Sequence, residues 1–333
     1  MKMQDVAKLA GVSTATISRV LNQPEMVREE TRRRVQQVLE QTQYVANAFA
    51  RGLVVSSMKT IGILTNDITS AYVAGMFHTI ERRFTELGYN VILANTGMEL
   101  ENKKKSLRMI LERQVDAVIL IGSMYKERKS NAHIFQAAAK VPVLIINNYI
   151  QAANVYSITC DDACGIRQAV QYLADLGHRH IYYFIDSRTP SALAKLKGFQ
   201  QGMAANGLDP GNVLPIACSL EGAAAGLREL IAKNPRVTAV VCGEDIVGIG
   251  VMKGCIQMKL RVPEDISVIG YNNTILAEAA TPSLTTVDND LLHTGLEAVH
   301  KLYDVFQGKP VAKKTAITPT LVIRESTGPV PER

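Results

Sequence analysis

The stretch from Thr60 to about residue 288 alternates short apolar runs with helical segments, and this alternation restricts the possible folds severely. Runs such as 117–121 are continuously apolar, which is typical of parallel strands buried on both faces. Regular alternation of strand and helix predicts doubly wound parallel sheets of the α/β class. Strands are expected at 61–65, 90–95, 117–122, 141–147, 180–186, 238–243 and 267–271. Helices are expected near 73–87, 101–113, 131–139, 162–176, 192–206, 222–233 and 245–258.

One such sheet usually holds about six strands, and the seven expected here, with another in the tail, exceed that number. We therefore expect two sheets, each in its own lobe. We expect a first lobe at about 60–158 and a second at about 159–289. The tail supplies a helix and then a strand at 316–324, which we expect to complete the first lobe over 290–324. Ligands bind at the carboxyl ends of the strands in open α/β sheets, so two facing lobes predict a binding cleft.

Residues 3–22 predict two short amphipathic helices joined by a tight turn. Gly11 suits the left-handed end of the first helix, and Ser13 suits the N-cap of the second. This spacing is the helix-turn-helix pattern, and an ordinary helical hairpin is the alternative. Apolar residues that would form its small core are Val6, Leu9, Ala10, Val12, Ile17, Val20 and Leu21.

The outer face of the second helix would carry Thr14, Ala15 and Arg19. Arg19 can donate two hydrogen bonds to the guanine edge in the major groove, and Thr14 can contact a base edge or a thymine methyl. Thr16, Ser18 and Asn22 suit phosphates, which position a protein without specifying sequence.

The charge of the chain is concentrated at its N-terminal end. Residues 1–60 carry nine basic and five acidic side chains, so they contribute 9 − 5 = +4 to the net charge of +6. A third helix is expected at 29–41, and its Arg32-Arg33-Arg34 run is either a solvated face or a phosphate contact. A basic terminal module is typical of proteins that bind a polyanion.

The segment 47–53 could form two helical turns, with Asn47 as the N-cap. Gly52 lowers its helix propensity, and isolated helices shorter than about 12 residues are marginal in water. We therefore expect it to be ordered only when something is bound.

Several classes of protein are disfavoured by the sequence. No apolar run reaches the length of a transmembrane helix, and the N-terminus lacks a secretory signal, so a cytoplasmic protein without membrane contact is expected. The five cysteines form no CxxC motif and are expected to be reduced packing residues.

Candidate cofactor and metal motifs are weak. The GxGxxxG run from Gly248 lies inside a predicted helix, which favours close helix–sheet packing over dinucleotide binding. His178 with His180, and Cys160 with Cys164, are more simply explained as loop and packing residues than as metal ligands. No catalytic motif occurs, so neither an enzyme nor a cofactor is expected.

These features together resemble the lactose-repressor (LacI/GalR) family of bacterial transcription regulators. Segments that match family signatures are 27–31 (VREET), 115–120 (VDAVIL), 176–181 (LGHRHI), 197–199 (KGF), 262–270 (VPEDISVIG) and 282–287 (PSLTTV). The resemblance implies a three-helix helix-turn-helix DNA-binding domain at 1–46, a hinge helix and linker at 47–59, and a core at 60–333. That core would be two-lobed, like periplasmic binding proteins, and would bind an effector and dimerise.

The resemblance also implies partners and site residues. The protein would bind a pseudo-palindromic operator as a homodimer, with Thr14, Ala15 and Arg19 at the base-reading positions of the recognition helix. Ser13, at the N-cap of that helix, would also contact the DNA. Asn47, Ala50 and Leu53 would lie in the hinge, where Leu53 would wedge into the minor groove and bend the DNA. The family's tetramers use a leucine-rich tail that residues 326–333 do not resemble, so we expect a dimer formed through the core.

An effector would bind between the lobes. The positions that match the family's ligand contacts are Asn66, Tyr72, Ser123, Asn147, Asp161, Lys195, Glu244, Asn272 and Asn289. Lys195 stands where arginine is usual, and Asn272 and Asn147 replace acids, so these contacts differ in charge and geometry from the family pattern.

We therefore expect a repressor whose affinity for its operator is set by a small polar effector such as a sugar or sugar derivative. A transport-type solute receptor is the first alternative, and residues 1–53 argue against it. A nicotinamide-dependent enzyme is the second, and it lacks the phosphate-binding turn.

Overall fold

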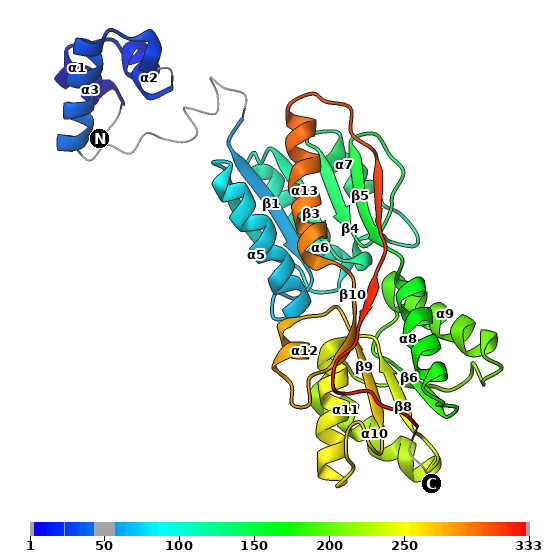
Figure 1. The fold of residues 1–333 in the computed structure, drawn as a ribbon. Helices are drawn as coiled ribbons and strands as arrows, with labels where there is room; N and C mark the ends of the chain where they lie inside the picture. The colour runs from blue at the N-terminus through cyan, green and yellow to red at the C-terminus, as the bar shows by residue number, and fades with distance from the viewer. Residues whose placement is uncertain (1–2, 23, 43–56, 331–333) are drawn as a thin grey trace. The chain divides into compact units, whose positions relative to one another are not determined.

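The computed structural model describes residues 3–22, 24–42 and 57–330. The chain divides into two compact units, Met1–Thr60 with Gln114–Asp116 and Ile61–Arg113 with Ala117–Arg333 (Figure 1). The predicted hinge residues Asn47, Ala50 and Leu53 lie outside the described residues.

The first unit contains the predicted three helices with a short 3₁₀ turn between the second and third. They are α1 (Met3–Ala10), α2 (Thr14–Asn22), η1 (Pro24–Met26) and α3 (Glu29–Thr42). Gly11 has a left-handed φ of 62°, and the Ser13 hydroxyl accepts a 3.1 Å hydrogen bond from the Thr16 amide, so both helix signals in the turn are confirmed. The small core differs from the prediction at one place, because Ala7 is buried while Leu9 is 61% exposed.

The second unit is built on two six-stranded sheets, which confirms the predicted α/β class with two lobes. The first sheet has the order β11-β5-β4-β3-β1-β2, and the second has the order β12-β10-β9-β8-β6-β7. Strands of the first sheet are β1 (Thr60–Thr65), β2 (Asn90–Asn95), β3 (Ala117–Ile121), β4 (Val143–Ile146), β5 (Val155–Cys160) and β11 (Lys314–Ile317). Strands of the second are β6 (Ile181–Ile185), β7 (Val213–Pro215), β8 (Ala239–Cys242), β9 (Ser267–Tyr271), β10 (Thr285–Asp288) and β12 (Thr320–Val322).

Helices cover the sheets because their apolar stripes face them. Around the first sheet lie α5 (Ala71–Glu86), α6 (Leu100–Glu112), η2 (Ser123–Tyr125), α7 (Ala132–Ala138) and α13 (Leu291–Phe306). Around the second lie α8 (Asp162–Asp175), α9 (Pro190–Ala205), α10 (Leu220–Lys233), α11 (Asp245–Gln257) and α12 (Ile275–Ala279). In the first lobe Met76 and Phe84 of α5 join Val299 and Leu302 of α13 in one buried cluster with the strands.

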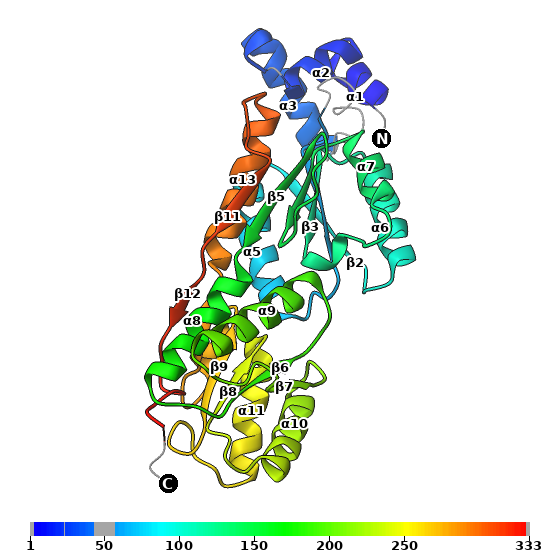
Figure 2. The ribbon, with the colours of Figure 1, turned by 90° about the vertical axis from the view of Figure 1, so that its right-hand side faces the viewer.

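The expected single strand at 316–324 is wrong, because the chain forms two strands there in different sheets. β11 pairs parallel with β5 in the first sheet, whereas β12 pairs antiparallel with β10 in the second. Pro319 lies between them and has no amide hydrogen to continue a ladder. The tail therefore runs along one side of both lobes and belongs to both (Figure 2).

The glycines of the GxGxxxG run pack against two different elements. A Cβ on Gly248 would lie 2.9 Å from Leu284, beside the second sheet. A Cβ on Gly250 would lie 2.7 Å from the backbone oxygen of Leu220, which opens α10. The predicted helix–sheet packing is thus correct for Gly248, while Gly250 allows α10 and α11 to approach closely.

Candidate functional site

The outer face of α2 presents polar and small side chains to solvent. Thr14, Ala15 and Arg19 are exposed, while Ile17 is fully buried and Val20 nearly so. Ser13 is also exposed and caps the helix, and its hydroxyl lies 3.0 Å from that of Thr16. Thr16 and Ser18 are half-buried, and Asn22 is the last residue of α2. Arg19 therefore stands on an exposed face of α2, where its guanidinium group can reach base edges in a DNA groove.

A cleft of about 680 Å³ lies between the two lobes of the second unit. Six of the nine predicted ligand residues line it: Asn66, Tyr72, Ser123, Asn147, Lys195 and Glu244. Several of them directly follow the carboxyl end of a parallel strand, as Asn66 follows β1 and Asn147 follows β4. Polar side chains from neighbouring strands are thereby brought to one edge, where open α/β sheets bind ligands.

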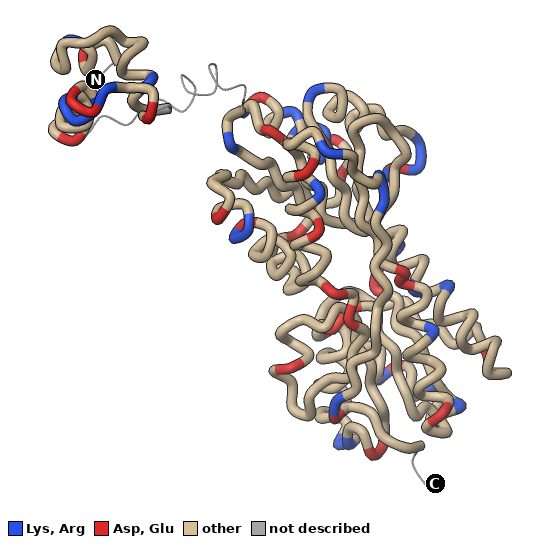
Figure 3. Tube along the Cα trace, turned by 45° about the horizontal axis from the view of Figure 1, so that its top comes forward, with Lys and Arg blue, Asp and Glu red and all other residues tan. Residues whose placement is uncertain are grey.

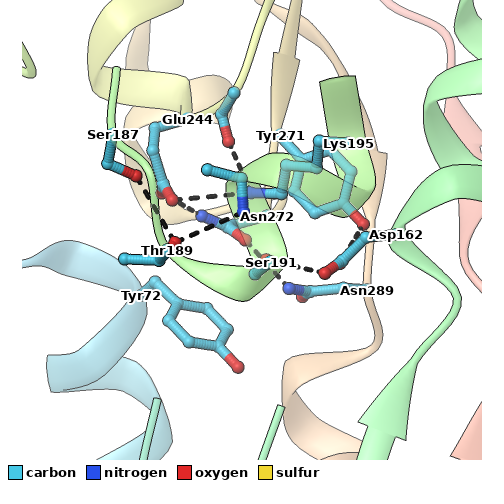
Figure 4. A network of polar contacts seen from close by, with 12 residues as sticks. Tyr72, Asp162, Ser187, Thr189, Ser191, Lys195, Glu244, Tyr271, Asn272 and Asn289 are labelled. Carbon is cyan, nitrogen blue, oxygen red and sulfur yellow. Dashed lines mark hydrogen bonds and ion pairs between the residues drawn. The ribbon is translucent and has the colours of Figure 1, made fainter. Parts of the chain in front are cut away.

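Lys195 is buried at the centre of a polar network (Figure 4). Its amine donates a 2.6 Å hydrogen bond to the Gly243 carbonyl, lies 3.5 Å from the Glu244 carboxylate and sits 3.8 Å from the centre of the Tyr271 ring. Lys195 is therefore not a solvated side chain on the surface of α9. Burial alone would lower the pKa of Lys195, but the nearby carboxylates, Glu244 first, outweigh burial and raise it.

Glu244 is the partner that carries the opposite charge. Burial raises its pKa to about 7, even though Lys195 acts in the opposite direction and lowers it. The carboxylate also accepts a short hydrogen bond from the Asn272 amide group. Asn272 in turn accepts a 2.8 Å hydrogen bond from Asn289, so a continuous chain of polar groups leads from the cleft into the second lobe.

Asn272 and Asn289 are buried behind Glu244 and do not themselves line the cleft. Asn272 has a φ of 100° and Asn147 a φ of 65°. Asparagine tolerates such left-handed backbone better than most residues, which supplies a structural reason for the amides at these two positions. Asn147 donates a 2.8 Å hydrogen bond to the Tyr72 hydroxyl, and burial raises the pKa of Tyr72.

Asp161 directly follows β5 and is exposed, and it caps α8 by accepting a 2.9 Å hydrogen bond from the Cys164 amide. It does not line the cleft. The next residue, Asp162, is buried and accepts hydrogen bonds from Tyr271 at 2.7 Å and Ser191 at 2.6 Å. The carboxylate of the central network therefore belongs to Asp162, which is not among the site residues predicted from the sequence.

Three further carboxylates at the cleft were missed, Asp67, Asp186 and Asp245. Each lies within three residues after the end of a parallel strand, so the expectation that ligands bind at the carboxyl ends of such strands could have identified them. Asp186 has a buried Oδ2 atom with no hydrogen-bond partner. Together with Glu244 they make this cleft acidic, and Figure 3 shows acidic positions in red at the level where the two lobes meet.

His178, one of the candidate metal residues, has structural partners instead. His178 is buried, with one ring nitrogen 2.9 Å from the Thr238 hydroxyl and the other 3.0 Å from the Gly328 carbonyl. Within the described residues no group of three or more possible ligands could hold a metal ion, and all five cysteines are free thiols. No helix among the described residues is long and apolar enough to span a membrane.

Known proteins show the same organisation. The sequence model of bacterial regulatory proteins of the lacI family matches residues 2–47, and that of the periplasmic binding protein-like domain matches residues 170–327. An HTH-type transcriptional regulator of Lachnoclostridium phytofermentans is 36% identical over 98% of this chain and 99% of its own. The ribose operon repressor of Haemophilus influenzae is 30% identical over 97% of this chain and 98% of its own. The crystal structure of the lac repressor dimer bound to operator and the anti-inducer ONPF has a TM-score of 0.88 at 26% identity, covering 98% of this chain and 99% of that one.

Proposed function

This chain belongs to the lacI family of bacterial regulatory proteins, and from that premise we propose that it binds a pseudo-palindromic operator as a homodimer under the control of a sugar-like effector. The family consists of DNA-binding transcriptional regulators rather than enzymes. What is proposed for this member is the form of its DNA site, its assembly and the chemical class of its effector.

The observation that carries the effector proposal is the polar cleft between the lobes. Glu244 and Asp186 can accept hydrogen bonds, while Asn147 and Asn66 can both donate and accept. Sugar hydroxyls both donate and accept, so one hydroxyl-rich ligand can satisfy such a mixed set. The buried Asp186 oxygen without a partner supports a ligand that donates hydrogen bonds. The name of the ribose operon repressor is consistent with this class.

The exposed face of α2 supports the DNA side of the proposal. Arg19 stands on this face with Thr14 and Ala15, as the sequence analysis predicts for a recognition helix. We propose that these residues contact base edges and that Ser13, Thr16, Ser18 and Asn22 contact the backbone. Asn47, Ala50 and Leu53 remain proposed hinge contacts on the basis of the family resemblance.

The proposal is tested by two linked measurements on the full chain. A thermal-shift screen against a sugar panel identifies a ligand, which at 100 times its Kd should stabilise the protein by about 2.7 kcal/mol. Fluorescence anisotropy with an operator selected from genomic fragments then measures DNA affinity with and without that ligand. A change of about 5- to 150-fold is expected for a coupled effector. A ligand that binds without altering operator affinity would contradict the allosteric role.

A further inference from the structure

A second cavity of about 650 Å³ lies next to the cleft in the same unit. We call it the basic chamber. Met98, Met124, Ser187 and Thr189 line both spaces, so a single ligand can extend from one into the other. The chamber is formed by the starts of α6 and α9 and by the segment between η2 and α7.

The charge of the basic chamber is opposite to that of the cleft. Its cationic lining residues are Lys103, Lys104, Lys126, Arg128, Lys129 and Arg188. Glu127 is the carboxylate that lines the chamber. The cleft has the reverse balance, with Asp67, Asp186, Glu244 and Asp245 against Lys195.

Most of this positive charge is not neutralised by the protein. Lys103 is buried and satisfied, since its amine donates to the Met124 carbonyl at 2.8 Å and to Glu127 at 2.9 Å. Lys104 pairs with Glu101 at 2.8 Å. The other four cations are exposed and form no ion pair with the part of the chain that the structure describes: Lys126, Arg128, Lys129 and Arg188.

Two uncharged groups in the basic chamber, a histidine ring and a helix N-terminus, can also contribute to binding an anion. The Nε2 atom of His133 is buried and has no hydrogen-bond partner. Burial lowers the pKa of His133, which leaves a neutral imidazole beside Lys103 and Lys104. The N-terminus of α6 opens at Leu100 without a side-chain cap, so the positive end of a 13-residue helix faces this space.

We propose that the basic chamber binds the phosphate group of a phosphorylated effector whose hydroxyl-bearing part occupies the cleft. This deepens the proposed function and rests on it. The carboxylates of the cleft would repel a phosphate there, whereas the exposed guanidinium groups of Arg128 and Arg188 can form charge-assisted hydrogen bonds with it. The opposite charges of the two spaces thus set the orientation of the ligand.

The test compares sugars with their phosphate esters by isothermal titration calorimetry on the full chain. The probes are ribose and ribose 5-phosphate, glucose and glucose 6-phosphate, and fructose and fructose 1-phosphate. At least one ester should bind about tenfold or more tightly than its sugar, since one hydrogen bond to a charged group contributes that much. Inorganic phosphate should compete with the ester and leave binding of the free sugar unchanged.

The triple variant Arg128→Gln/Lys129→Gln/Arg188→Gln should abolish the advantage of the ester while preserving sugar binding. These side chains are exposed, so the fold should be retained. The matched control, Lys105→Gln/Arg108→Gln/Lys140→Gln, removes the same charge from exposed positions of the first lobe that do not line the chamber, and it should keep the advantage.

Two results would overturn the chamber assignment. One is that no ester binds more tightly than its sugar, and the other is that the advantage survives in the triple variant. Either result leaves the proposed function intact if a free sugar still changes operator affinity. The proposed function fails separately if neither sugars nor esters change operator affinity.

Discussion

Glu244 couples the stability of the core to pH. Burial raises the pKa of this carboxyl to about 7 in the folded protein. Between about pH 5 and pH 7 the folded state therefore holds a proton on Glu244 that the unfolded state has lost. The free energy of unfolding should therefore fall as pH rises through this window. Glu244→Gln should flatten this dependence, which urea unfolding at several pH values would measure. Glu278→Gln, at an exposed carboxylate, is the matched control and should leave the slope unchanged.

Arg19 tests the DNA-reading face of α2. Arg19→Ala should weaken binding to the selected operator by about 1–3 kcal/mol, because a bidentate contact with guanine would be lost. Anisotropy with random DNA should show a much smaller loss. Arg34→Ala, which removes an exposed arginine from α3, serves as the control and should not relax sequence preference. Equal losses on both kinds of DNA for Arg19→Ala would make Arg19 a phosphate contact.

The sequence alone does not determine which of two neighbouring aspartates enters the binding site. Asp161 and Asp162 are neighbours at the start of α8, and either could be the one that enters the binding site. Successive residues of a helix point about 100° apart, so the choice depends on how α8 is rotated against the sheet. Packing of Ile166 and Val170 into the second lobe fixes that rotation and directs Asp162 inward.

At the scale of elements, Gly198 allows α8 and α9 to pack closely. A Cβ at this position would lie 2.4 Å from the Ala163 backbone oxygen and 2.7 Å from its Cα atom. Because backbone cannot move aside cheaply, Gly198→Ala should lower the free energy of unfolding by about 1–3 kcal/mol in urea titration. Gly75→Ala in α5 meets only a Leu291 methyl at 3.2 Å and should cost much less. Similar effects in the two variants would contradict this account.

The predicted strands agree with the structure for the buried centres of the sheets and differ from it for the shortest strands and in the tail. The central strands β3 and β8 are fully buried and continuously apolar, and the sequence predicts both. It misses β7, and it merges β11 and β12 into one strand; these three strands have three or four residues each and lie at the edges of their sheets. It also misses β5 and β10, in which polar residues are frequent. Such short strands are held by pairing partners distant in sequence, which a local hydrophobic pattern does not contain.

At the scale of the whole core, three segments pass between the lobes. β5 of the first sheet leads into α8, β10 of the second sheet leads back into α13, and β11 leads into β12. These connections are single chains, so the lobes can change their relative angle with little rearrangement inside either sheet. A ligand that contacts Asn147 on one side and Glu244 on the other would favour one angle, which is how effector binding would reach the DNA-binding residues.

The proposed homodimer needs an apolar surface on the core, and α13 supplies one. Leu292 is 61% exposed and Leu296 is 40% exposed, and a spacing of four residues places both on one face of the helix. The opposite face of α13, including Ala298 and Leu302, is buried in the first lobe, so the two leucines are available to a second copy.

We therefore expect Leu296→Glu to place a charge in the dimer interface and to yield a monomer in sedimentation velocity. Operator affinity should fall by about 10²- to 10⁴-fold, because two half-sites would no longer be bound by linked domains. Met109→Glu, at a methionine of α6 with 44% exposure, is the matched control and should remain a dimer. Effector binding should persist in both variants, since neither residue lines the cleft. A Leu296→Glu protein that keeps a dimeric mass would show that the copies associate through another surface.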